Sequence, residues 1–194
     1  MKDILELSSG EKIRFRHIKK ADLDAVWRNF NEVVKEDIYP VFSPVETQYE
    51  KESWYDNLKR EKNLCIVADN LNLEHPFNVI GQCEISNIEW DASRHVGSLG
   101  IIVQHKYRDL GIGYRLIDIA IRDAYKLNNK KKIILSCFSN NERAIHLYKK
   151  IGFIKVGQRK AQFKIEENYY DEVLMDLCIE DYLNKKKHLN LESK

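Results

Sequence analysis

The chain has 194 residues, of which 43% are hydrophobic and 10% aromatic, with only eight Gly and three Pro. This length and composition predict one sizeable hydrophobic core and exclude disordered, collagen-like and low-complexity classes. Thirty-two Lys and Arg against thirty Asp and Glu leave a formal net charge of +2, so the composition does not favour nucleic acid as a partner.

Cysteine and histidine positions predict neither a disulfide framework nor a metal site. The four cysteines, at positions 65, 83, 137 and 178, form no C-x-x-C pair, which favours reduced, buried thiols. The six histidines are widely separated. Acidic residues interrupt the first 16 positions, and no stretch approaches the roughly 20 apolar residues of a membrane helix. We therefore expect a cytoplasmic protein that uses no metal and has no membrane partner.

The first half of the chain predicts two strands of a hairpin preceded by a strand and two helices. Apolar periodicity and turn residues place these elements at 13–18 (strand), 23–34 (helix), 47–58 (helix), 64–68 (strand) and 79–85 (strand). Asp22 stands where it can cap the first helix or favour its positive end. Thr47 and Glu50 have the spacing of a capping box at the start of the second helix.

The second half predicts a strand at 96–103, a helix at 113–127, a strand at 133–137, a helix at 141–150 closed by Gly152, strands at 153–156 and 162–165 around a turn near Gly157, and a last strand at 170–177. The strand-helix-strand segment 96–137 is expected to run parallel. The pattern predicts a mixed α/β fold with about seven strands and about four helices. Residues 1–179 are expected to form one domain, with 180–194 as a polar, solvated or partly helical extension.

A strand, a loop with two glycines and a helix follow one another directly over residues 103–116. Gly111 and Gly113 leave backbone N–H groups and a helix N-terminus open toward an anion such as a phosphate. The Rossmann fingerprint is not met, because position 116 is Leu, and no Gly-Lys-Ser or Gly-Lys-Thr follows to make a P-loop. An ordinary strand-to-helix turn is the alternative interpretation.

A second motif follows the first after about 28 residues. Arg108-x-x-Gly111-x-Gly113 is joined by a segment with the pattern Asn141-x-x-Ala144-x-x-Leu147-Tyr148-x-Lys150-x-Gly152-Phe153. Together they resemble the GCN5-related N-acetyltransferase family over nearly the whole chain. The ending from Gly157 to Met175 is similar to the branch that contains ribosomal-protein alanine and polyamine acetyltransferases. The resemblance implies a twisted mixed sheet, splayed at its centre, with acetyl-CoA as cosubstrate in the splay.

The resemblance also assigns cofactor-binding residues. The pyrophosphate is expected on the backbone amides of Arg108, Asp109, Leu110, Gly111, Ile112 and Gly113. The pantetheine arm is expected to pair like an extra strand with Ile101, Ile102 and Val103, and to receive a hydrogen bond from Asn141. For Asn141 the role of helix N-cap is compatible with this assignment. Arg108 and Arg115 add positive charge, although either residue is also consistent with an ordinary solvated arginine.

The same resemblance indicates direct attack of a primary amine on the thioester, with no covalent enzyme intermediate. Tyr148 is the expected general acid, because a phenol can protonate a departing thiolate; a packing aromatic is the alternative. Many family members place a Glu where this chain has Ser98. Glu84, a carboxylate in an otherwise apolar strand, is the first substitute as general base, and His95 is the second, with an exposed loop histidine as its alternative.

A non-catalytic acyl-CoA sensor or scaffold module is the competing hypothesis for function. The acceptor itself is suggested by charge: residues 31–61 carry eight acidic and four basic residues, whereas residues 104–132 carry eight basic and three acidic ones. In the resembling family the first two helices border the acceptor groove, so an acidic rim with Tyr39, Phe42 and Tyr49 is expected to attract a cationic amine. A solvated helix surface is the alternative. A homodimer is expected for a small domain of this kind.

Overall fold

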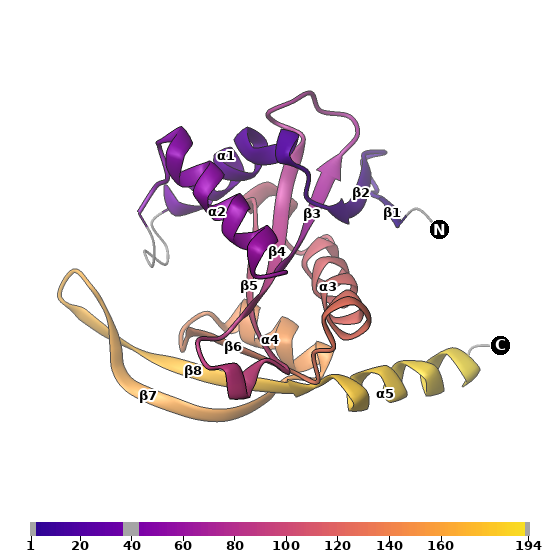
Figure 1. Ribbon diagram of the computed structural model, residues 1–194, viewed down its shortest axis with the longest axis vertical. Coiled ribbons are helices and arrows are strands. Elements are labelled where there is room, and N and C mark those ends of the chain that lie inside the picture. The colour runs from indigo at the N-terminus through magenta and orange to yellow at the C-terminus, as the bar shows by residue number, and fades with distance from the viewer. Residues whose placement is uncertain (1–2, 37–42, 193–194) are drawn as a thin grey trace. The chain divides into compact units, whose positions relative to one another are not determined.

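The computed structural model describes residues 3–36 and 43–192 (Figure 1). The chain forms two compact units. The first comprises the chain up to Ser86 together with Gly100–Ala120, and the second comprises Asn87–Leu99 together with the chain from Ile121 onward. In hydrogen-bonding order the strands of the described residues follow β1-β2-β3-β4-β5-β6-β8-β7.

The first unit is an antiparallel sheet with two helices from the N-terminal half. Its elements are β1 (Ile4–Glu6), β2 (Lys12–His17), α1 (Leu23–Val34), α2 (Gln48–Arg60), β3 (Leu64–Asn70), β4 (Val79–Asn87), the end of β5 (Val96–Val103) and the start of α3 (Ile112–Asn128). Strands β1 to β4 pair antiparallel in chain order. At the end of β5, the amide of Gln104 donates to the carbonyl of Ile80 on β4 over 3.0 Å. The predicted hairpin of β3 and β4 is confirmed.

Apolar residues spaced along α1, α2 and the neighbouring strands explain why these elements pack together. Helices α1 and α2 lie side by side (Figure 1), and the rings of Trp27 and Trp54 meet edge to face with centroids 5.1 Å apart. The core cluster consists of Ile18, Ala25, Val26, Leu58, Cys65, Val67 and Val79. The predicted capping box is confirmed, because Thr47 Oγ1 accepts from the amide of Glu50 over 3.2 Å.

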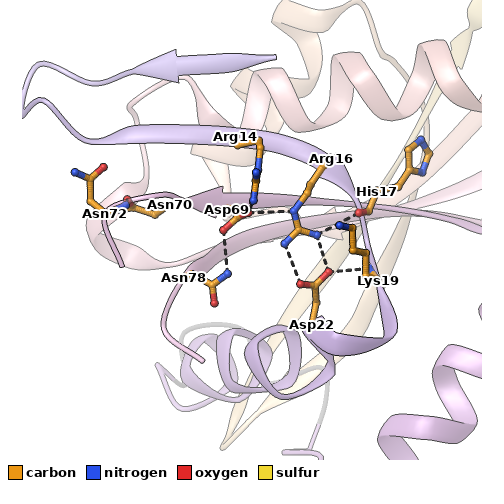
Figure 2. Close-up of polar contacts among 9 residues, drawn as sticks. All are labelled: Arg14, Arg16, His17, Lys19, Asp22, Asp69, Asn70, Asn72 and Asn78. Atoms are coloured by element: carbon orange, nitrogen blue, oxygen red, sulfur yellow. Dashed lines mark hydrogen bonds and ion pairs between the residues drawn. The ribbon is translucent and has the colours of Figure 1, made fainter. Parts of the chain in front are cut away.

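Asp22 does not cap α1 as the sequence suggested. Its carboxylate accepts the backbone N–H of Lys19 over 2.7 Å and pairs with the guanidinium of Arg16, while making no cap hydrogen bond to α1 (Figure 2). Arg16 also donates a hydrogen bond to the carboxylate of Asp69 on β3, and this carboxylate accepts from Arg14 and Asn78 as well. The buried face between the start of α1 and the sheet therefore holds a charge-balanced network rather than a helix cap.

The second unit combines the start of β5 and the end of α3 with β6 (Lys132–Phe138), α4 (Glu142–Ile151), β7 (Ile154–Ile165), β8 (Asn168–Cys178) and α5 (Ile179–Glu192). Strand β5 runs parallel to β6, with Val96 opposite Lys132 and Ser98 opposite Ile134. Strand β8 pairs antiparallel with both β6 and β7. The predicted parallel strand-helix-strand arrangement is confirmed.

The structure contains more regular elements than the sequence analysis counted: eight strands and five α-helices among the described residues. Strand β1 was missed because it has only three residues. The predicted turn near Gly157 is wrong. Gly157 pairs with Leu174 inside the long strand β7, and register shifts on either side of it make bulges rather than a turn. In Figure 1, β7 and β8 accordingly form one long two-stranded ribbon.

The polar C-terminal segment is a helix. Helix α5 begins directly after β8, and the side chains of Ile179 and Tyr182 are buried. Its first turn is therefore anchored by packing, and polar residues follow. None of the helices in the described part of the chain has the length and apolar character needed to cross a membrane.

The four cysteines are free thiols. Cys65 and Cys83 are buried, and burial raises the pKa of both thiols. Cys137 is half-buried, with its pKa raised to about 11 by burial, and Cys178 is exposed. The expectation of buried thiols is confirmed at Cys65 and Cys83, is met only in part at Cys137, and fails at Cys178, the last residue of β8.

Candidate active site

The loop between β5 and α3 has the backbone geometry of an anion site. A short 3-10 turn, His105–Tyr107, follows β5, and Asp109 and Gly111 then adopt left-handed conformations with φ of 62° and 80°. Helix α3 begins at the next residue, Ile112. Left-handed residues just before a helix turn successive N–H groups toward one point, where the helix N-terminus adds its positive end. The residues present therefore fit a pyrophosphate.

The two glycines of this loop differ in position: Gly111 precedes helix α3, and Gly113 lies within it. Gly111 needs its positive φ, and no protein atom lies within 4 Å of the position that a Cβ would take there. Gly113 is the second residue of α3. A third glycine, Gly81 on β4, allows a close approach that the sequence analysis missed, because a Cβ there would lie 3.2 Å from the carbonyl oxygen of Ile102. The expected pantetheine-binding segment of β5 thus lies close against β4.

Tyr107, which precedes residues 108–113, is a buried and hydrogen-bonded anchor of the loop. Its side chain is 3% exposed, and its hydroxyl accepts from Asn70 Nδ2 over 3.0 Å and donates to Glu11 Oε1 over 3.1 Å. Asn70 Nδ2 also donates to Glu11 over 2.8 Å. These hydrogen bonds, with one from Ser9 as the largest contributor, lower the pKa of Glu11. The residue that precedes the loop is therefore fixed to β3 and to the turn after β1.

Arg108 is held by two groups of the protein itself. Its Nε donates to the carbonyl of Val103 over 2.8 Å, and its Nη2 lies 2.6 Å from Oε2 of Glu36, two residues after the end of α1. The side chains of Arg108 and Glu36 are 13% and 20% exposed. Around Arg108, Ile101, Ile102 and Val103 are half-buried on β5, whereas Asp109 and Leu110 are exposed. The expected phosphate-binding cation thus has a carboxylate partner in this structure.

Glu84 has the environment of a proton acceptor. It lies half-buried on β4, and burial raises its pKa, an effect only partly opposed by the hydrogen bond that Trp54 Nε1 donates over 3.2 Å. Two residues earlier on the same face of β4, Gln82 Oε1 accepts from Asn29 Nδ2 of α1 over 3.1 Å. A carboxylate with a raised pKa accepts a proton near neutral pH more readily than an exposed one.

The remaining predicted residues belong to the second unit. Tyr148 on α4 is 7% exposed, and its ring meets Phe153 edge to face with centroids 5.8 Å apart. Asn141 is confirmed as the N-cap of α4, since its Oδ1 accepts from the amide of Ala144 over 3.2 Å. His95 is exposed in the turn before β5, and Ser98 is half-buried within β5.

Comparison with known proteins identifies the family. A sequence model of the acetyltransferase (GNAT) family matches residues 31–153, more than half of the chain. The chain belongs to the acetyltransferase (GNAT) family. Among curated relatives, a Vibrio cholerae spermidine N(1)-acetyltransferase is 26% identical over 183 residues, covering 92% of this chain and 99% of the relative. An N-alpha-acetyltransferase of Sulfurisphaera tokodaii is 27% identical over 179 residues, covering 87% and 96%.

A solved structure shares the fold of this GNAT chain. It is a Salmonella typhimurium protein described as an acetyltransferase and determined with its cofactor acetyl-CoA; it is 20% identical, covers 86% of this chain and 94% of its own, and has a TM-score of 0.75. The predicted resemblance, the mixed α/β fold and the enzyme class of acetyltransferase are therefore confirmed.

The acidic segment of this GNAT chain is partly neutralised by its own cations. Glu36 pairs with Arg108, and Glu32 pairs with Arg28 over 2.5 Å. Tyr49 is 80% exposed, whereas the expected rim residues Tyr39 and Phe42 lie outside the described residues. Within residues 3–36 and 43–192, no group of three or more His, Cys, Asp and Glu side chains could hold a metal ion.

Sequence analysis missed several residues that shape this GNAT site. Asn29 and Asn70 are fully buried polar residues, and Trp54 reaches Glu84 from α2. The available signal was weak: Asn29 interrupts the apolar face of a predicted helix, and Asn70 ends an apolar strand next to a turn. A polar residue inside an apolar pattern signals a buried hydrogen bond, but the partner is set by the tertiary fold.

Proposed function

We propose that this GNAT enzyme transfers an acetyl group from acetyl-CoA to the primary amine of a cationic acceptor, with a polyamine as the first candidate and a basic peptide N-terminus as the second. The anion-binding geometry of the loop at Asp109 and Gly111 carries the proposal on the cosubstrate side. The names of the Vibrio cholerae and Sulfurisphaera tokodaii relatives and the acidic excess of residues 31–61 support it on the acceptor side.

Binding and orientation of the cosubstrate are assigned to backbone groups. The N–H groups of residues 108–113 would hold the pyrophosphate, and the edge of β5 at residues 101–103 would align the pantetheine arm. Asn141 Oδ1 already caps α4, so its Nδ2 is the group left to donate toward that arm. When bound, acetyl-CoA supplies an activated thioester, which needs no covalent enzyme intermediate.

Proton transfer is assigned to two side chains. Glu84, whose pKa is raised by burial, would take a proton from the attacking ammonium group, and Tyr148 would give a proton to the departing sulfur. Loss of the first proton frees the amine to attack the thioester, and the nitrogen loses a second proton as the amide forms and the carbon–sulfur bond breaks. That second proton would restore Tyr148, and Glu84 would release its proton to solvent, so that each turnover releases one proton. His95 is the second candidate for the base.

Release of free thiol from acetyl-CoA, with and without a panel of amines, tests the function. We expect amine-dependent release in which Tyr148→Phe lowers turnover by about 10²-fold while acetyl-CoA affinity barely changes. Tyr182→Phe, which alters another buried tyrosine of the second unit, is the matched control. Equal turnover of Tyr148→Phe and wild type would make Tyr148 a packing partner of Phe153. No release with any amine would favour a non-catalytic acyl-CoA-binding module.

Acceptor charge is tested by ionic strength. If the acidic segment faces the acceptor, kcat/KM for a cationic amine should exceed that for an acidic one, and the ratio should shrink as salt rises, because salt screens exposed charges. Equal values at low and high salt would mean that residues 31–61 do not face the substrate. We also propose that the enzyme is a homodimer in solution. Light scattering tests this by measuring whether the molar mass is that of one chain or of two.

A further inference from the structure

The ion pair between Arg108 and Glu36 joins a residue of the cosubstrate loop to the end of α1. Nη2 and Oε2 are 2.6 Å apart, and both side chains are largely buried. Arg108 and Glu36 are ion-pair partners in the described part of the chain, and Arg108 Nε also donates to the carbonyl of Val103 over 2.8 Å. Removing one member of such a pair leaves an uncompensated charge in a poorly solvated place, which is strongly unfavourable.

Glu36 follows helix α1 by two residues and belongs to the acidic segment that the proposed function assigns to the acceptor. Asn29, seven residues earlier on α1, donates to Gln82 over 3.1 Å, so this helix packs against the strand that carries Glu84. Of the acidic residues in that segment, Glu36 pairs with the cosubstrate loop, where it can receive an ammonium group of a polycationic acceptor once its own cation is withdrawn.

Either substrate alone would disturb the ion pair. A phosphate at the 108–113 loop attracts Arg108, because guanidinium–phosphate hydrogen bonds are charge-assisted and often bidentate, and this withdraws the ion-pair partner of Glu36. An ammonium group at Glu36 leaves Arg108 without an anion. Both charges have a partner in the free protein, through the ion pair itself, and both have one again when the two substrates are bound together. One substrate alone leaves one of the two charges without its partner, so each substrate should bind more tightly in the presence of the other.

Resting on the proposed acetyl transfer to a cationic acceptor, we infer that the Arg108–Glu36 ion pair couples the two binding sites: cosubstrate phosphate takes over Arg108 and so releases Glu36 for the acceptor. Glu36 thereby becomes a specificity-determining residue for polycationic acceptors, and free acceptor binds weakly until the cosubstrate is present.

Isothermal titration calorimetry with spermidine, in the presence and absence of saturating CoA, measures the coupling. We expect CoA to tighten spermidine binding by about tenfold in the wild type, within the usual range for linked sites. In Glu36→Gln the factor should fall to about one, while CoA affinity is equal to or tighter than that of the wild type. In Arg108→Gln, spermidine should bind more tightly than to the wild type without CoA, because Glu36 is already released.

Glu32→Gln is the matched control. It removes a carboxylate one helical turn earlier whose partner, Arg28, is outside the loop, so the coupling factor should stay at the wild-type value. The double variant E36Q/R108Q keeps a neutral pair and serves if a single variant fails to fold; its coupling factor should be about one. An unchanged factor in Glu36→Gln or the double variant, or weaker spermidine binding by Arg108→Gln, would overturn the inference. Failure of the proposed function is distinct, because it would appear as absence of thiol release by the wild type with any amine.

Discussion

The indole N–H of Trp54 on α2 donates to the carboxylate of Glu84 on β4 over 3.2 Å. The hydrogen bond stabilises the charged carboxylate, yet burial outweighs it and raises the pKa of Glu84. The pair therefore holds a carboxylate in a fixed position and keeps its proton affinity above that of an exposed glutamate. Both properties are required of a general base that acts near neutral pH.

Replacement of Glu84 by Gln should lower kcat/KM by about 10²-fold or more, because the proton acceptor is lost while the shape is kept. In the wild type, activity should fall as pH decreases through the raised pKa of Glu84, and this acidic limb should be absent from the profile of the variant. The measurement is kcat/KM against pH with a constant amine. Persistence of the limb in Glu84→Gln and its loss in His95→Ala would move the role of base to His95.

The same variant should be more stable than the wild type at neutral pH. A carboxyl group whose pKa is higher in the folded than in the unfolded protein binds its proton more tightly when folded, so its contribution to stability declines as pH rises from the ordinary value of 4.5 through the raised one. Gln carries no such penalty. Urea unfolding at pH 7.5 and at pH 4.5 measures the difference, which should shrink toward the lower pH; a variant less stable at pH 7.5 would contradict the prediction.

Local patterns in the sequence were sufficient for the elements that carry the family motifs. The helix cap of Asn141, the capping box of Thr47 and Glu50, and the strand before the glycine loop all depend on neighbouring residues. The Rossmann and P-loop alternatives could be excluded because both are defined by local spacing.

Local sequence patterns could not predict the contacts between residues that lie far apart in the sequence. Arg108 was expected to face solvent or phosphate, and only the fold places Glu36 beside it. The Asn70–Tyr107 hydrogen bond joins residues 37 positions apart. The sequence predicted a turn at Gly157, within what is the single strand β7, because glycine is common both in turns and in bulges. Only the pairing of β7 with β8 shows that the irregularity is a bulge.

Tyr107 is expected to act as a positioning residue for the cosubstrate loop. Tyr107→Phe removes the hydroxyl that Asn70 and Glu11 hold, but it preserves the buried ring. The loss of a hydrogen bond to a charged group should weaken acetyl-CoA binding by about tenfold, while kcat at saturation stays within about a factor of two. Steady-state kinetics with acetyl-CoA as the varied substrate separates the two effects. A fall in kcat without a change in KM would contradict this role.

Gly111 is predicted to matter for its backbone conformation. A φ of 80° with open space around the Cβ position means that Gly111→Ala meets strain but no clash, and the cost should be about 1 kcal/mol. If the loop binds phosphate in this conformation, acetyl-CoA affinity should fall as well. Gly10→Ala is the matched control, because Gly10 has a φ of 83° and equal space but lies in the turn between β1 and β2. If the two variants bind acetyl-CoA equally well, the backbone conformation of Gly111 does not contribute to acetyl-CoA binding.

Asp69 should be the main source of acid sensitivity in the first unit. Its side chain is 4% exposed. Burial alone would raise its pKa, but hydrogen bonds from Arg14, Asn78 and Arg16 outweigh burial and lower it (Figure 2). A carboxyl group with a lowered pKa in the folded state contributes stability above its ordinary value of 3.8, and that contribution is lost as pH falls through the lowered pKa.

Asp69→Asn should therefore lower the free energy of unfolding by about 2 kcal/mol or more at pH 7, because two arginines lose their shared carboxylate. The difference from the wild type should narrow as pH falls below the ordinary value of 3.8 and through the lowered pKa of Asp69, where the wild-type carboxylate is itself protonated. Urea unfolding from pH 7 to pH 2.5 follows both effects. Asp24→Asn is the control: Asp24 is 61% exposed and pairs with Lys51 at the surface, so its loss should cost about 0.5 kcal/mol or less. A pH profile for Asp69→Asn parallel to that of the wild type would place the acid-sensitive group elsewhere, with Asp22 as the next carboxylate to replace, since it shares Arg16 with Asp69.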